Sequence, residues 1–118
     1  MINKLFLLIL LITLSSSKNK NKFDFIEKDI PYLKNLYLDF HQNPEISLME
    51  KSTSKKLANE LKKIGFNVTE NFGGYGIVGI FKNGDGPTIL YRTDMDALPM
   101  EEKTNLPYAS KVKTKNFD

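Results

Sequence analysis

The spacing of apolar residues changes at Gly65, and this change does most to restrict the fold. Before it, apolar side chains recur three and four residues apart, as they do on one face of a helix. After it, the chain reads as short runs rich in β-branched and aromatic residues: FNV at 66–68, IVGIF at 77–81 and TILYR at 88–92. Helices followed by strands predict an α/β domain in which helices pack on a sheet.

The first expected helix begins at Asp29, which can cap it, and carries Pro31 in its first turn, where a missing N–H costs nothing. It should end before Pro44. Its apolar residues have helical spacing: Ile30, Leu33, Leu36, Tyr37 and Phe40.

The second expected helix runs from about Ser52 or Thr53 to Ile64, and Gly65 provides its C-terminal stop. Lysines occupy the face opposite its apolar one. The apolar face comprises Leu57, Ala58, Leu61 and Ile64.

Turn-forming residues separate the expected strands. The string Asn83-Gly84-Asp85-Gly86-Pro87 has the chemistry of a hairpin turn between the last two of them. The glycines at 73, 74 and 76 form a loop ahead of the middle strand, and their spacing is neither a dinucleotide fingerprint nor a P-loop. TILYR is almost continuously apolar, which predicts a central strand buried on both faces.

The front of the chain has the features of a secretory signal. LFLLILLITL, at 5–14, follows Lys4 and precedes three serines, whereas a membrane span needs about 20 apolar residues. We therefore expect a signal peptide over 1–17, a polar linker over 18–22 and entry into the secretory pathway, with no stable membrane span. An uncleaved anchor and a buried core segment are the alternatives.

Charge and cysteine usage exclude some functions. The net charge is +3, but the front of the chain alone contributes Lys4, Lys18, Lys20 and Lys22. The remainder is near neutral, so nucleic-acid binding is not expected. The chain has no cysteine, which rules out disulfides and thiolate metal ligands within it.

Asp94 and Asp96 follow TILYR directly. If the strand continues through them, alternation places both carboxylates on one side and Met95 on the other. Ligands of open α/β sheets bind beyond the carboxyl ends of strands, and carboxylates there can serve a cation or orient a metal-bound histidine. A solvated acidic turn before Pro99 explains the pair equally simply.

Four stretches, FHQNPEISLMEKSTSKKLANELKKIGF, GGYGIVGIF, GPTILYRTDMDALPMEE and LPYAS, occur in an order and at a spacing that resemble the amidohydrolase branch of the M20 metallopeptidases. This branch includes hippurate hydrolases and hydrolases of plant hormone conjugates. The resemblance covers about Leu36 to Val112. HQNPE and DMDALP are its most specific motifs.

The resemblance implies a two-domain hydrolase that cleaves the amide between an acyl group and an amino acid, with a smaller domain that makes dimer contacts. Residues 23–118 would be the N-terminal part of its three-layer, zinc-peptidase-like catalytic domain, with two helices packed on a mixed sheet. The full-length family would use divalent metal, zinc or manganese, and a small N-acyl amino acid as substrate.

The resemblance also implies roles for single residues. Asp96 would be the catalytic-site carboxylate that orients the metal site, and Asp94 a residue of the site wall. His41, the only histidine, would be a motif residue rather than a metal ligand. Glu45 and Glu50 would fix the following turn and helix start. Which residues bind substrate is not indicated.

The sequence departs from the family after LPYAS, where family members continue into a segment with metal-ligating histidine and cysteine and then a general-base glutamate. Here the sequence reads KVKTKNFD. We therefore expect a truncated N-terminal portion that binds no metal and is inactive alone. The alternatives are a short secreted binding protein that pairs through exposed sheet edges, and an enzyme of altered chemistry using Asp94, Asp96 and His41.

Asn67-Val68-Thr69 is a glycosylation sequon within an expected strand. A bulky glycan requires an exposed edge, so we expect the sequon to be a chance occurrence.

Overall fold

The computed structural model describes residues 23–114, and the expected signal peptide and linker lie outside this range. The chain divides into two units at Lys34/Asn35, and α3 (Ile30–Gln42) crosses this division. In the first unit, α2 (Asp24–Glu27) precedes α3. The described part of the chain contains no helix long and apolar enough to cross a membrane.

Local chemistry sets the ends of α3. The N–H of Leu33 donates to the carbonyl of Asp29 at 2.8 Å, which places Asp29 at the N-cap, as predicted. At the other end, the side-chain amide of Asn43 donates to the carbonyl of Asp39 at 2.9 Å, and Pro44 follows. Because Pro44 disfavours a helical residue before it, the helix ends where the sequence predicts.

The second unit contains α4 (Lys51–Lys63), the other predicted helix. It ends in a Schellman arrangement, in which the N–H of Gly65 donates to Lys62 at 3.1 Å and that of Phe66 to Leu61 at 3.0 Å. Gly65 has φ +93°, which glycine adopts without a steric penalty. The predicted stop at Gly65 is therefore confirmed.

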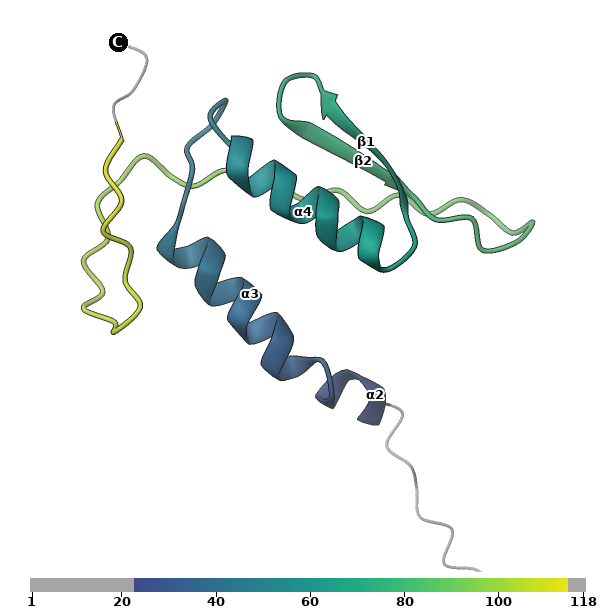
Figure 1. The fold of residues 1–118 in the computed structure, drawn as a ribbon, viewed down its shortest axis with the longest axis horizontal. Coiled ribbons are helices and arrows are strands. Elements are labelled where there is room, and N and C mark those ends of the chain that lie inside the picture. Colours follow the sequence, from purple (N-terminus) through teal and green to yellow (C-terminus); the bar gives the residue numbers. More distant parts are fainter. Residues whose placement is uncertain (1–22, 115–118) are drawn as a thin grey trace, which may run out of the picture. The chain divides into compact units, whose positions relative to one another are not determined.

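A hairpin packs against α4, formed by β1 (Asn67–Phe72) and β2 (Gly76–Ile80) in antiparallel pairing (Figure 1). Its register pairs Asn67 with Ile80 and Thr69 with Val78, and it shifts before Phe72. At Gly79 an added Cβ would lie 3.1 Å from the side chains of both Leu61 and Phe66. A larger residue there would therefore require the side chains of Leu61 and Phe66 to shift.

The core of the second unit is small. Ala58 is its one fully buried apolar residue among those described, and Thr53 and Ser54 are the buried polar ones. The rings of Phe66 and Phe81 add a contact with their centroids 5.3 Å apart. Asn67 is exposed at the start of β1, so the sequon meets the exposure requirement, and its chance occurrence stays a prediction.

Two predictions about the strands are wrong. The hairpin turn is not at 83–87 but at Gly73-Gly74-Tyr75, where two successive glycines with positive φ allow a tight reversal. Residues 88–92 are not a buried central strand: within residues 23–114 their backbone joins no ladder, and Leu90 is 88% exposed. A strand requires a hydrogen-bonded neighbour, and the described chain provides none for this segment.

The α/β class is confirmed, because a helix packs on a β-hairpin. The described sheet is the antiparallel hairpin, and parallel pairing occurs as an isolated bridge between Ile46 and Ala97. This bridge joins the loop between α3 and α4 to the segment that contains the two aspartates.

Candidate functional site

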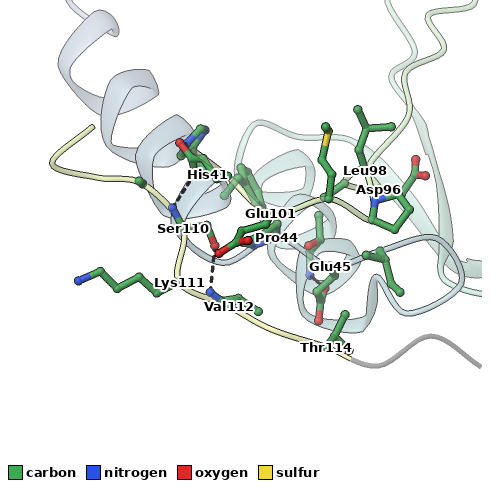
Figure 2. Close-up of a pocket in the computed structure, with 18 of the residues that line it drawn as sticks. His41, Pro44, Glu45, Asp96, Leu98, Glu101, Ser110, Lys111, Val112 and Thr114 are labelled. Carbon is green, nitrogen blue, oxygen red and sulfur yellow. Dashed lines mark hydrogen bonds and ion pairs between the residues drawn. The ribbon is translucent and has the colours of Figure 1, made fainter. Parts of the chain in front are cut away.

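Asp94 and Asp96 lie in an extended segment without strand pairing. Both side chains are exposed, whereas Met95 and Ala97 are half-buried, so the predicted alternation holds without a ladder. Asp94 forms an exposed ion pair with Arg92, with 2.9 Å between Oδ1 and Nη2. Figure 2 shows the Asp96 carboxylate pointing away from His41 and Ser110.

The segment is attached to the α3–α4 loop directly after Asp96. The N–H of Ala97 donates to the carbonyl of Glu45 at 2.8 Å, beside the parallel bridge between Ala97 and Ile46. The two most specific motifs of the sequence, HQNPE and DMDALP, are therefore in direct backbone contact. This fixes the chain position of Asp96 while its side chain stays open to solvent.

His41 lies at the end of α3 and contacts a residue that the sequence does not single out. Its Nε2 is 3.0 Å from both carboxylate oxygens of Glu102. Its ring lies near two tyrosines, with its centroid 5.8 Å from that of Tyr37 and 5.4 Å from that of Tyr108. His41 therefore contacts a carboxylate and two aromatic rings, a setting that agrees with the motif role that the resemblance implies.

Glu102 gathers several donors from its own end of the chain. Thr104 Oγ1 donates to it, and the N–H of Ser110 does so at 2.6 Å. The hydrogen bond from Thr104, then those from Ser110 and His41, lower the pKa of Glu102 to about 2. Because these groups stabilise the charged form, Glu102 is ionised at neutral pH.

Glu45 fixes the start of α4, as predicted. Its carboxylate accepts the N–H of Ser52 at 3.0 Å and that of Thr53 at 2.7 Å. Burial acts to raise the pKa of Glu45, but the hydrogen bonds from Thr53 and Ser52 outweigh it, so the pKa lies below its usual value. Two of the four unpaired N–H groups of the first helical turn are thus satisfied.

Glu50 supports the preceding turn rather than the helix itself. Its Oε1 accepts the N–H of Leu48 at 2.9 Å, and Leu48 has the unusual φ of +66°. Glu50 thus helps to fix the turn that follows Glu45, but the predicted role at the helix start falls to Glu45 alone, because the Glu50 side chain makes no cap hydrogen bond to α4.

An open pocket lies between the end of α3, its following loop and residues 93–114. Its lining includes His41, Glu45 and Asp96, which Figure 2 labels, and also Asp94 and Glu102. The candidate residues therefore share one surface, but His41 pairs with Glu102 and Asp94 with Arg92, while Asp96 faces solvent.

These side chains do not form a metal centre by themselves. Within residues 23–114, no three His, Asp, Glu or Cys side chains are grouped so that they could hold a metal ion. A zinc site normally takes three or four protein ligands. The described residues thus do not fit the metal that the resemblance implies, and they could at most contribute to a site completed elsewhere.

Glu102 is the residue that sequence reasoning missed. Glu101 and Glu102 are adjacent carboxylates, and no local pattern shows which one turns inward. The pairing with His41 spans 61 residues, which propensity and periodicity do not reveal. The one sequence signal for Glu102 is that it lies in DMDALPMEE, a motif that occurs together with HQNPE and LPYAS.

No family model matches the chain. Individual relatives do: it is 49% identical to the hippurate hydrolase of Campylobacter jejuni over 72 residues, which are 60% of this chain and 19% of that protein. It is 40% identical to an N-acetylcysteine deacetylase of Bacillus subtilis over 82 residues, 68% of this chain and 22% of that protein.

A solved structure supports the same relationship. The Bacillus subtilis YXEP protein, a dinuclear metal-binding peptidase of the M20 family, matches with a TM-score of 0.62 and 39% identity over 70% of this chain and 23% of that one. The chain spans about a fifth of the length of the curated relatives it matches. On this identity and fold, the chain belongs to the M20 metallopeptidase family, in its amidohydrolase branch, and corresponds to an N-terminal portion of those proteins.

Proposed function

We propose that residues 23–114 are the opening part of the catalytic domain of a metal-dependent amidohydrolase that hydrolyses N-acyl amino acids. The observation that carries the proposal is the 49% identity to a hippurate hydrolase. Hippurate and N-acetylcysteine, the compounds in the relatives' names, both contain an amide between an acyl group and an amino acid. The acyl and amino-acid preferences of this protein are left open.

Within that enzyme, we assign Asp96 the role of a positioning carboxylate at the metal site. Support comes from its place: it is exposed on the pocket surface, and the Ala97–Glu45 hydrogen bond holds the chain beside it. A divalent metal would supply activation of water and of the amide carbonyl, as in other metallohydrolases. The ligands for that metal would come from residues beyond those described.

The proposal has a second part, that a polypeptide of these 118 residues has no turnover by itself. Metal-assisted hydrolysis needs a held cation, an open coordination position and a base. The described residues group no three candidate ligands. A lone exposed carboxylate such as Asp96 does not hold a cation in a defined geometry.

A chimera tests both parts. Residues 23–114 replace the matching segment of the Campylobacter jejuni hippurate hydrolase, and hippurate hydrolysis is measured with added zinc or manganese, beside the 118-residue polypeptide. We expect the chimera to turn over hippurate and the polypeptide to show none. Asp96→Ala in the chimera should lower kcat/KM by roughly 10- to 100-fold, as loss of an orienting group does at metal sites.

Asp85→Ala is the matched control, because Asp85 is an exposed aspartate in the turn before the site. It should leave kcat/KM within about twofold of the parent chimera, as distant surface changes do. Full activity of the Asp96→Ala chimera would contradict the assigned role. Turnover by the polypeptide alone that Asp96→Ala abolishes would contradict the second part.

A further inference from the structure

Four residues connect the end of α3 to the chain that follows DMDALP, and we call them the clamp: His41, Glu102, Thr104 and Ser110, the last of which donates its backbone N–H to Glu102. Glu102 is at its centre and accepts hydrogen bonds from the other three. Ser110 makes a second connection, because its Oγ donates to the carbonyl of Gln42 at 3.2 Å. The last two residues of α3 therefore both hold residues 102–110.

The chemistry of the clamp specifies its hydrogen positions. Glu102 is ionised at neutral pH and offers only acceptors. Because both of its oxygens lie 3.0 Å from His41 Nε2, that nitrogen carries the proton that is shared between them. The side chains of His41 and Glu102 are 27% and 16% exposed, so water competes only partly for this contact.

The clamp and the Ala97–Glu45 hydrogen bond hold the same segment at two points. Ala97 follows Asp96 directly, and Glu102 lies one short turn further on. Both attachments lead to the stretch that comprises the last turn of α3 and the HQNPE motif. With one attachment lost, the Asp96 segment could pivot about the other.

We propose that His41 and Glu102 are positioning residues, which act through residues 97–102 to hold Asp96 in its working place in the complete amidohydrolase. The proposal rests on the proposed function and deepens it. It gives the HQNPE histidine a task that requires no metal ligation. A displacement of about 1 Å at a site can cost on the order of 100-fold in rate, so a remote attachment can matter for catalysis.

The test uses the chimera described above with His41→Ala, Glu102→Ala and the double variant. We expect each single change to lower kcat by about tenfold or more with little change in KM, because geometry and not substrate binding is lost. The kcat of the double variant should lie within about threefold of the kcat of the less active single variant, because both changes remove the same attachment. His41→Gln, whose amide N–H can replace Nε2–H, should recover much of the loss.

Hydrogen exchange provides a readout independent of activity. Peptides covering residues 94–99 should exchange faster in both single variants, while peptides from α4 stay unchanged. Asp85→Ala is again the control, because Asp85 is exposed and does not line the pocket, and it should change neither rate nor exchange.

An inactive parent chimera would refute the proposed function. Hydrogen exchange would then be the one remaining test of the clamp. Unchanged exchange at 94–99 in the single variants would refute the clamp. So would fully additive losses in kcat, or the absence of rescue by His41→Gln.

Discussion

At the scale of single residues, two adjacent glutamates have different surroundings. Glu101 is exposed, whereas Glu102 turns inward and receives hydrogen bonds from Thr104, Ser110 and His41. The folded chain holds the donors of Ser110 and His41 beside Glu102 in addition to its neighbour Thr104, and there the pKa of Glu102 is lowered to about 2. The unfolded chain has the ordinary value of 4.5. The contacts of Glu102 therefore make folding depend on pH.

We predict that Glu102 stabilises the fold fully above its unfolded pKa and loses this effect as pH falls through its folded pKa of about 2. The sign follows because a lowered pKa means that the unfolded chain binds the proton first. The thermal midpoint of the chimera should therefore exceed that of its Glu102→Gln variant by a constant amount above about pH 5, and the gap should shrink toward pH 2. Glu101→Gln should show no such trend, and a gap unchanged down to pH 2 would exclude this account.

At the scale of elements, α3 and α4 were predictable from sequence, whereas the short α2 and the unpaired state of the 88–92 segment were not. Helix ends depend on neighbours in the chain, such as Pro44 after α3 and Gly65 after α4, so the sequence carries their signal. A strand depends on a partner that the local sequence does not name. The apolar run at 88–92 indicates a strand, yet the described residues offer it no ladder.

The α4 start gives the element-scale prediction. Glu45→Ala should lower the free energy of unfolding by about 1 kcal/mol, because the N–H groups of Ser52 and Thr53 lose their acceptor, as in other cap deletions. Glu45→Gln keeps one carbonyl acceptor and should lower the free energy of unfolding by less. Denaturant unfolding of the chimera measures both, with exposed Ser47→Ala as the control. Equal stability of Glu45→Ala and its parent would show that water replaces the carboxylate without cost.

At the scale of the whole molecule, the described chain leaves a continuous apolar stretch uncovered. Ile89, Leu90 and Tyr91 are 81%, 88% and 97% exposed. Together with a core in which Ala58 is the fully buried apolar residue, this is too much uncovered surface for a stable monomer. The M20 relatives are about five times longer than the matched segment.

We predict that the purified 118-residue polypeptide self-associates, because unpaired backbone and apolar side chains at 88–91 meet the same surface on other copies. Leu90→Lys should reduce the association measured by analytical ultracentrifugation. Thr88→Lys adds the same charge in the same segment without removing an apolar side chain, and it should reduce self-association less. A monodisperse monomer that melts cooperatively would contradict the prediction.

The double attachment of residues 97–102 also has a consequence for the order of folding. His41 and Glu102 are 61 residues apart, and the entropy cost of closing a loop rises by about 0.6 kcal/mol with each doubling of its length. Once Ala97 has paired beside Ile46, only a short stretch on each side separates His41 from Glu102, so the second closure costs much less. The contacts within the hairpin and between the hairpin and α4, which are local, can form while the chain is still being synthesised. We therefore expect the pocket side of the protein to assemble last, starting from the bridge between Ala97 and Ile46.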